Sequence, residues 1–372
     1  MKKINWKVIV VCVVVALIAG FIICSNMKEQ KALQESGKRN VYAVLPLSGP
    51  LAVWGKQAQE TIDYYLKKNP DAPMNLIYID SEGNPSKALT ALQSKILDEK
   101  NPIVISAVSS ISAALLPFLD QHGGFNVSMY TKVSPATATY KNQQRISFPI
   151  LTEMGEKLID YMNKHYKTMA IFYSEDELGR LGLNAMKEVF KGEVIGAYSF
   201  SVAERDVRNT VVKALATNPD AVFVISPPSI GYRNVINELG TAGYQGGILT
   251  NQGYQVTWVF QNLEGMDNVM FPCYDILLDE NTSEKRKQVM AELSAEGLDL
   301  NCLRIEPYNA VAFVDYMLKH NIPFERSEIL KMKTFEGIAG PITFTEDGDA
   351  EFELGFCTIK DGKIVSMEIE EK

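Results

Sequence analysis

The sequence predicts an α/β protein with two lobes, and three observations support this fold class. The chain has 372 residues, which is more than one compact core usually holds. Short apolar runs alternate with helical patterns in two successive sets, and such alternation produces right-handed crossovers in a parallel sheet. The hydrophobic content of 46% is typical of a folded globular protein. We therefore expect two doubly wound, Rossmann-like α/β lobes.

The first set begins at Val41–Leu45, an apolar run typical of a buried parallel strand. Ser48-Gly49-Pro50 ends this run, and a helix with Gly55 in its first turn follows. Asn84-Pro85-Ser86 then forms a turn and an N-cap ahead of another helix. The remaining elements expected in this set are strands at Met74–Asp80, Ile103–Ala107 and Val127–Tyr130, and a helix ending near Gln121.

The second set alternates in the same way, and its expected elements are a helix at Thr152–Tyr166, a strand at Met169–Tyr173, a helix at Leu181–Phe190, a strand at Val194–Phe200, a helix at Val207–Ala216, a strand at Ala221–Ile225, a helix at Ile230–Ala242 and a strand at Gly247–Asn251. Past Tyr274 the alternation of strands and helices ends. Three helices are expected there, at about Glu284–Glu296, Pro307–His320 and Arg326–Met332. The tail is expected to form strands at Ile342–Phe344, Glu353–Lys360 and Ile364–Ile369, joined by turn residues at Glu346–Asp349 and Asp361-Gly362.

The N-terminal segment predicts export from the cytoplasm. Lys2, Lys3 and Lys7 precede the apolar run Val8–Cys24, and this order retains the N-terminus in the cytoplasm and sends the rest across. A cleaved signal peptide, a lipid on Cys24 and an uncleaved anchor remain open. We expect a protein tethered to the outer face of a bacterial cell membrane, with the polar residues 25–40 as the tether.

Charge and cysteine content exclude several classes of function. The net charge of −8 and the pI near 5.2 argue against nucleic-acid binding. No Cys-x-x-Cys occurs and the three histidines stand alone, so neither a metal site nor a cofactor is expected. The chain has no Ser-His-Asp order and no nucleotide fingerprint, so an enzyme is not expected. Two alternatives remain open for Cys273, Cys302 and Cys357: two of them form a disulfide, or all three are buried thiols.

The first strand–loop–helix unit indicates where a ligand binds. In an open α/β sheet, ligands bind beyond the carboxyl ends of the strands and beside helix N-termini. Residues 41–59 have this organisation, and the aromatic Trp54 lies just past the loop. The alternative for this segment is an ordinary βα connection.

Several short motifs occur along the chain in a characteristic order. They are Leu47–Pro50 with Trp54-Gly55, Asp80–Pro85 followed by Ala88, Val108-Ser109-Ser110, Asp176 with Gly179, Pro307–Ala310, and Gly337–Phe344 with Gly348-Asp349. In this order and spacing, the chain from Val41 onward resembles the type I periplasmic binding proteins of the leucine/isoleucine/valine-binding family. These proteins are the solute-binding components of ABC importers.

The resemblance implies two lobes joined by a three-strand hinge, with crossings near Ser147–Ile150, Pro272–Tyr274 and Ala339–Pro341. Lobe 1 would comprise residues 41–147 and 275–338, and lobe 2 residues 148–274 and 339–372, after an anchor and tether at 1–40. A small solute would bind between the lobes without any cofactor, and hinge closure would bury it. The closed form would be recognised by the permease, which works with ATPase subunits.

Candidate ligand-binding residues of lobe 1 lie in three loops. Ser109, Ser110 and Ser112 lie between a strand and a helix N-terminus, where hydroxyl and backbone N–H groups suit a carboxylate. The alternative is helix capping by Ser112. By resemblance, Tyr130 and Thr131 complete this cradle, and Trp54 covers the ligand side chain or else belongs to the core or the rim.

Lobe 2 departs from the family pattern at three loops. Leu178 replaces a tyrosine, Pro227-Pro228-Ser229 replaces a segment that often carries an aromatic residue, and Gln252 replaces the acidic residue that receives the ligand's ammonium group.

A buried ammonium needs an anionic or strongly accepting partner. Glu153 is the only acidic candidate near the cleft, and it also suits the dipole of its own helix. We therefore expect a carboxylate without an amine, or an amide-like solute, to bind more tightly than a free amino acid. The alternative function is ligand sensing together with a separate membrane signalling protein.

Overall fold

A computed structural model gives the fold of the chain, and it describes residues 37–96, 99–131, 140–147, 155–263, 269–274, 284–298, 300–351 and 354–367. The expected anchor Val8–Cys24 and the candidate ligand residue Glu153 lie outside the described residues. Within the described ranges, no helix has both the length and the apolar character needed to cross a membrane.

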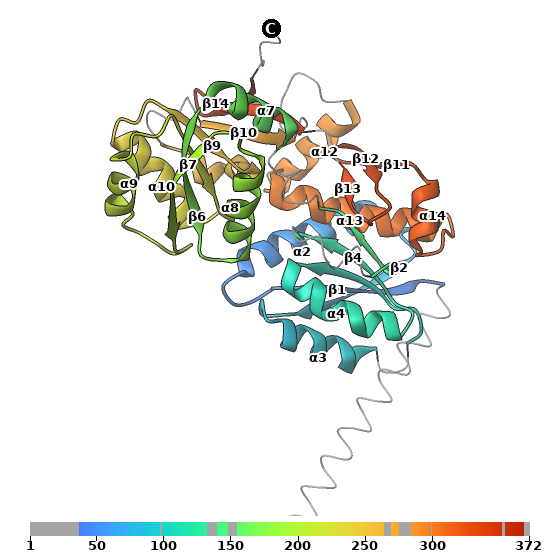
Figure 1. The fold of residues 1–372 in the computed structure, drawn as a ribbon. Coiled ribbons are helices and arrows are strands. Elements are labelled where there is room, and N and C mark those ends of the chain that lie inside the picture. The colour runs from blue at the N-terminus through green and yellow to red at the C-terminus, as the bar shows by residue number, and fades with distance from the viewer. Residues whose placement is uncertain are drawn as a thin grey trace, which may run out of the picture.

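The structure has two α/β lobes, as the sequence predicts (Figure 1). The first lobe has a five-stranded parallel sheet in the order β2-β1-β3-β4-β5. Its strands are β1 (Arg39–Leu45), β2 (Met74–Asp80), β3 (Ile103–Ala107), β4 (Phe125–Met129) and β5 (Gln143–Arg145). Its helices are α2 (Ala52–Lys68), α3 (Pro85–Lys95) and α4 (Ser109–Gln121).

Both faces of this sheet are covered. Alternate residues of β1 face opposite sides, so Val41 and Ala43 belong to one apolar cluster while Tyr42 and Val44 belong to another. Helices α3 and α4 cover the second face, and α2 packs with the C-terminal helix α13 (Cys302–Lys319) over the first. The near-continuous apolar runs of these strands therefore reflect burial on both faces.

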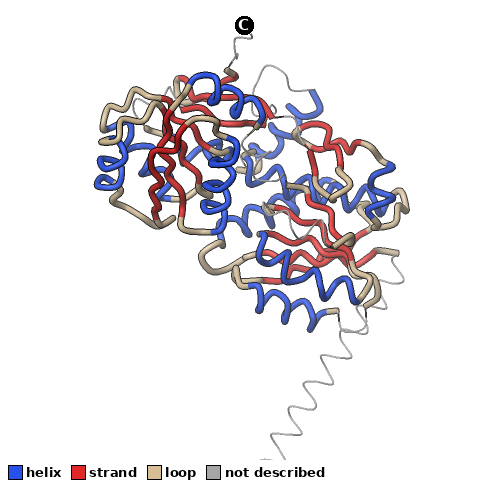
Figure 2. Tube along the Cα trace, in the orientation of Figure 1, coloured by secondary structure: helices blue, strands red, loops and turns tan. Residues whose placement is uncertain are grey.

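The second lobe has a seven-stranded sheet in the order β15-β14-β10-β9-β8-β6-β7. Its strands are β6 (Thr168–Ser174), β7 (Glu193–Phe200), β8 (Ala221–Ile225), β9 (Gly247–Thr250), β10 (Val269–Tyr274), β14 (Leu354–Lys360) and β15 (Lys363–Ser366). Its helices are α7 (Glu156–His165), α8 (Glu177–Val189), α9 (Arg208–Leu215), α10 (Ile230–Thr241), the 3-10 turn η1 (Gln252–Gln255) and α11 (Thr257–Phe260). Strands β6 to β10 are parallel, and β14 and β15 add an antiparallel edge. Figure 2 shows helices beside the strands in both lobes.

The predicted hairpin at Asp361-Gly362 is confirmed. Lys360 pairs with Lys363, and the two residues between them have φ angles of 51° and 71°. Two positive φ values are what a type I′ turn requires, and an Asp-Gly pair adopts them at low cost.

The third chain crossing differs from the expectation. Ala339–Pro341 was expected to lead into lobe 2, but β12 (Gly340–Phe344) pairs with β11 (Thr334–Gly337) and β13 (Ala350–Glu351) in a separate antiparallel sheet. This small sheet packs against α13. The chain joins the lobe 2 sheet only at β14, so residues 339–351 lie with lobe 1. The two other C-terminal helices are α12 (Glu284–Ala295) and α14 (Arg326–Lys331).

A buried ion pair fastens the small sheet to lobe 1. The Arg145 side chain at the end of β5 is fully buried, and its Nε donates to Oδ1 of Asp349 over 2.8 Å. Its Nη2 donates to the same oxygen, and its Nη1 donates to the carbonyl of Thr131.

We predict that Asp349→Ala lowers the free energy of unfolding by about 3–5 kcal/mol, because it leaves the Arg145 guanidinium buried without its counterion. Urea unfolding of the full chain measures this change. The control is Asp347→Asn, an exposed neighbour, for which a change within about 0.5 kcal/mol is expected. Equal effects of the two substitutions would contradict the importance of the ion pair.

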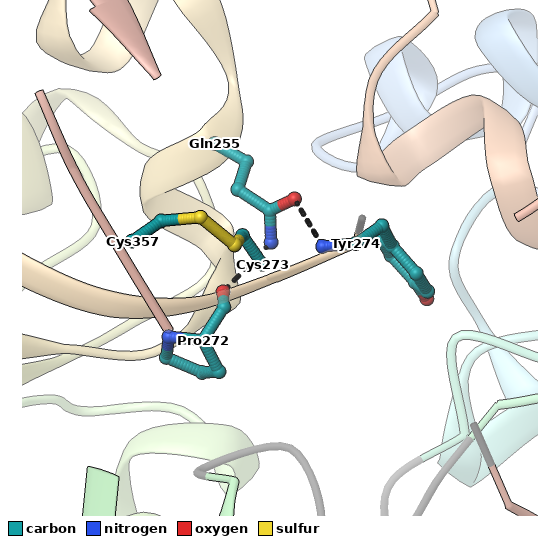
Figure 3. The surroundings of a disulfide bond; sticks show 5 residues. All are labelled: Gln255, Pro272, Cys273, Tyr274 and Cys357. Atoms are coloured by element: carbon teal, nitrogen blue, oxygen red, sulfur yellow. Dashed lines mark hydrogen bonds between the residues drawn. A yellow bond between two sulfur atoms is a disulfide. The ribbon is translucent and has the colours of Figure 1, made fainter. Parts of the chain in front are cut away.

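One disulfide stabilises the lobe 2 sheet. Cys273 on β10 is bonded to Cys357 on β14 (Figure 3). Cys302 is buried and is not part of a disulfide among the described residues. Beside the disulfide, the Gln255 amide donates to the Pro272 carbonyl over 2.9 Å and accepts from the Tyr274 N–H over 3.1 Å. The amide thus binds the backbone on both sides of Cys273.

We predict that the double substitution Cys273→Ser and Cys357→Ser lowers the unfolding free energy by about 2–5 kcal/mol, because the disulfide closes a long loop in the unfolded chain. The two residues are 84 positions apart. Denaturant unfolding measures the effect, and Cys302→Ser is the control with an intact disulfide. Peptide mapping without reductant should recover Cys273 linked to Cys357; recovery of Cys302 in a disulfide would contradict the assignment.

Candidate ligand-binding cavity

A cavity of about 170 Å³ lies between the lobes, at the carboxyl ends of both parallel sheets. Lobe 1 contributes residues from the starts of α2, α4 and α13 and from the end of β4. Lobe 2 contributes residues from the start of α8 and from the loops that follow β8 and β9. Much of the wall is apolar, and its apolar members include Leu51, Trp54, Val108, Leu178, Leu181, Pro227 and Leu303.

Trp54 lines the cavity. It lies in the first turn of α2, and its ring meets the Tyr130 ring edge-on with 5.2 Å between the centroids. Gly55 allows this turn to approach the preceding loop, because a Cβ at that position would lie 2.1 Å from the Pro46 carbonyl oxygen. The motif Trp54-Gly55 thus combines a wall residue with the glycine that positions it.

Asp80 shapes the same loop. Its carboxylate accepts hydrogen bonds from the backbone N–H groups of Leu47, Ser48 and Glu82 at 2.8–3.2 Å. Burial alone would raise the pKa of Asp80, but these donors favour the charged form and its pKa is lowered. The residue therefore holds two loops of lobe 1 together at the carboxyl ends of β1 and β2.

The three candidate serines have different roles. Ser109 is the first residue of α4 and lines the cavity, where the first N–H groups of a helix lack intrahelical acceptors. Ser110 is exposed and is not part of the cavity wall. Ser112 is buried, and its hydroxyl hydrogen-bonds to the hydroxyls of Ser106 (2.7 Å) and Thr131 (3.3 Å). It neither lines the cavity nor caps α4.

Tyr130 forms a wall of the cavity and adopts an unusual backbone conformation. Its φ is 53°, which is uncommon for a bulky residue. Its hydroxyl donates to the Leu303 carbonyl. That carbonyl is left without a helical donor because Pro307, four residues later in α13, has no N–H. Burial, followed by the nearby Glu306 carboxylate, raises the pKa of Tyr130 above its usual value, so the hydroxyl stays a donor.

Thr131 was expected to complete the cradle, but it is buried and is not part of the cavity wall. Its N–H donates to the Ser147 hydroxyl over 3.0 Å, and its own hydroxyl donates to the Met129 carbonyl over 3.2 Å. Both groups therefore serve contacts within lobe 1.

The sequence analysis missed Glu306, a buried acidic residue of α13 that lines the cavity. Its Oε2 accepts from the Tyr130 N–H and from the Ser147 hydroxyl, each over 2.6 Å. The available signal was a glutamate between apolar residues, directly before Pro307. Asp176 and Glu177 also line the cavity. The expectation that Glu153 is the only acidic candidate is therefore wrong, and the charge argument against a free amino acid loses its basis.

In lobe 2, Leu178 lines the cavity. The preceding Asp176 is the N-cap of α8, and its Oδ1 accepts from the Gly179 N–H and the Ser174 hydroxyl, both at 2.9 Å. A Cβ at position 179 would lie 2.0 Å from the Ser174 carbonyl oxygen. The aspartate and the glycine of this motif thus fix the start of α8, which places Leu178 in the wall.

Ser229 and Gln252 differ in role. Ser229 is the N-cap of α10, where its hydroxyl accepts from the Tyr232 N–H over 3.2 Å, and it does not line the cavity. Pro227 and Pro228 take its place in the wall. Gln252 lines the cavity at the start of η1, and its Oε1 is buried without a hydrogen-bond partner.

The described residues offer no metal site, since no group of three or more His, Cys, Asp or Glu side chains among them could hold an ion. Helix N-termini supply donors, Glu306 and Gln252 supply acceptors, and the apolar wall removes water from a ligand body.

Comparison with known proteins places this cavity in a wider context. A model of the family described as periplasmic binding protein matches residues 41–363. No curated protein matches the chain. Among solved structures, the leucine-binding protein LivK from Thermotoga maritima is similar, with a TM-score of 0.75 and 19% identity over 88% of this chain and 97% of that one.

Two ligand complexes are similar to a comparable degree. LivJ from Streptococcus pneumoniae, with isoleucine, gives a TM-score of 0.74 and 16% identity over 88% of this chain and 97% of that one. A solute-binding protein from Rhodopseudomonas palustris, in complex with 3,4-dihydroxybenzoic acid, gives a TM-score of 0.76. Its identity to this chain is 21%, over 90% of this chain and 96% of that one. These structures share the two-lobed α/β fold. Because the family model covers most of its length, the chain belongs to the periplasmic binding protein family.

Proposed function

We propose that this protein captures a small amino-acid-like or other polar solute outside the cytoplasm and delivers it to an ABC importer. The observation that carries the proposal is the cavity between the lobes, which combines apolar walls with a few convergent polar groups. The similar proteins bind isoleucine and 3,4-dihydroxybenzoic acid. Both ligands contain a carboxylate attached to an apolar body.

The arrangement of helices supports a carboxylate ligand. Helices α2, α4, α8 and α13 all begin at the cavity, through Leu51, Ser109, Asp176 and Cys302. The N-terminus of a helix carries partial positive charge, so it stabilises a nearby anion. The side chains of Asp176 and Asn301 already accept from the first turns of α8 and α13, whereas α4 has no side-chain cap. Glu306 and Asp176 each engage two protein donors, so both carboxylates also hold the wall in place.

We predict that Trp54→Ala weakens solute binding by about 1–3 kcal/mol without unfolding the chain, because the substitution removes a large aromatic wall surface. A thermal-shift screen of amino acids, aromatic acids, amides and short peptides identifies a ligand by the stabilisation it causes, and calorimetry then measures affinity. Trp258→Ala is the matched control, since Trp258 is 40% exposed and is not part of the wall. Unchanged affinity in Trp54→Ala would refute this placement of the site.

We further propose that the protein stays on the outer face of the membrane, through Val8–Cys24 or a lipid on Cys24. Lys2, Lys3 and Lys7 before the apolar run support this orientation. Fractionation of cells should find the protein with the membrane, and Cys24→Ser distinguishes lipid from helix because only the lipid needs the thiol. A fully soluble mature protein beginning after Gly20 would contradict the tether.

A further inference from the structure

The amide of Gln252 is a polar group of the cavity wall whose hydrogen bonding is incomplete. Its side chain lines the cavity while the residue is only 4% exposed. Its Oε1 is buried and has no hydrogen-bond partner. A buried acceptor without a donor loses the hydrogen bond it made to water and gains nothing in return, so native proteins rarely retain one without a reason.

The backbone that carries Gln252 is fixed on both sides. The N–H of Tyr254 donates to the Asn251 carbonyl over 3.2 Å, and the Tyr232 hydroxyl donates to the same carbonyl over 3.4 Å. A Cβ on Gly253 would lie 3.3 Å from both the Pro228 ring and the Ser226 carbonyl oxygen. Gln252 is therefore held against the cavity by its neighbours.

The remainder of the cavity has complementary chemistry. Across the cleft, α4 begins at Ser109 and offers N–H donors. Between these two ends lie apolar side chains, including Trp54, Leu178 and Leu303. A ligand that satisfies both ends has an acceptor such as a carboxylate at one end, an apolar body, and an N–H or O–H donor at the other.

We propose that Gln252 is a specificity-determining residue and that the solute carries a hydrogen-bond donor, a hydroxyl or an N–H group, which its Oε1 accepts. This inference rests on the proposed solute-binding function and adds the chemical class of the solute. A neutral amide oxygen accepts from an uncharged donor without requiring a countercharge.

The test uses ligands that differ by one donor of nearly equal size. The aromatic series is 4-methylbenzoate, 4-hydroxybenzoate and 4-aminobenzoate, and the aliphatic pair is hexanoate and 5-hydroxypentanoate. Calorimetry or thermal shift gives the affinity of each for the wild-type protein and for Gln252→Met, which keeps the side chain's length but removes its amide. Gln245→Met, at an exposed glutamine, is the control.

The donor-bearing ligand of at least one series should bind about 10-fold or more tightly than its methyl analogue in the wild type, as expected for satisfying one buried acceptor. That ratio should fall close to one in Gln252→Met and persist in Gln245→Met. Because the wild-type ratio is measured without any substitution, poor folding of a variant does not affect it.

Two results would overturn the inference in different ways. Equal binding of methyl and donor-bearing ligands, or a ratio that persists in Gln252→Met, would refute the role of Gln252 and leave the solute-binding function standing. No binding of any of the five compounds, together with no stabilisation by any solute in the wider screen, would refute both.

Discussion

The buried carboxylate of Glu306 makes the hydrogen bonds that hold both the cavity wall and the ends of two lobe 1 strands in place. A buried carboxylate is costly unless it is hydrogen-bonded, and this one accepts from the N–H of Tyr130 and the hydroxyl of Ser147. Tyr130 follows β4 and Ser147 follows β5, so one side chain of α13 joins the ends of two adjacent strands. The wall of the cavity and the segment that leaves lobe 1 are thus held at a common point.

Pro307, the residue after Glu306, also helps to position Tyr130. Its missing N–H leaves the Leu303 carbonyl available to the hydroxyl of Tyr130. Held at both its backbone and its hydroxyl, Tyr130 presents its ring edge-on to Trp54. A proline within a helix is usually destabilising, but here its missing N–H leaves the Leu303 carbonyl free to accept from Tyr130, an aromatic residue of the cavity wall. The two aromatic residues are therefore positioned before any ligand enters, which lowers the ordering cost of binding.

The C-terminal chain connects the lobes through two fixed contacts. Asp349 forms the buried ion pair with Arg145 of lobe 1. Eight residues later, Cys357 forms the disulfide with Cys273 of lobe 2. The backbone between these anchors passes from the small sheet to β14, so the chain is attached firmly on each side of one crossing.

The sequence by itself determined most strands and helices of the two lobes and the sheet edge at which the cavity lies. Strands such as Met74–Asp80 and Ala221–Ile225 are found at their predicted bounds, because apolar periodicity and turn residues are local signals. Trp54 and Ser109 were placed near the cavity because parallel strands bring the loops at their carboxyl ends to one edge. Tyr130, Leu178 and Gln252 were placed there by the resemblance to the family.

Only the tertiary structure decided how the side chains at that edge are used. The sequence offered Ser112, Thr131 and Ser229 as ligand-binding residues on the same footing as the others. In the structure, their hydroxyl or backbone N–H groups form hydrogen bonds within the lobes. Glu306 accepts a hydrogen bond from Tyr130, although the two residues are 176 positions apart in the sequence. The pairing of Cys273 with Cys357 and of β12 with β11 and β13 likewise depends on packing between elements. Such contacts leave no periodic trace in the sequence, because they are set by the packing of distant segments.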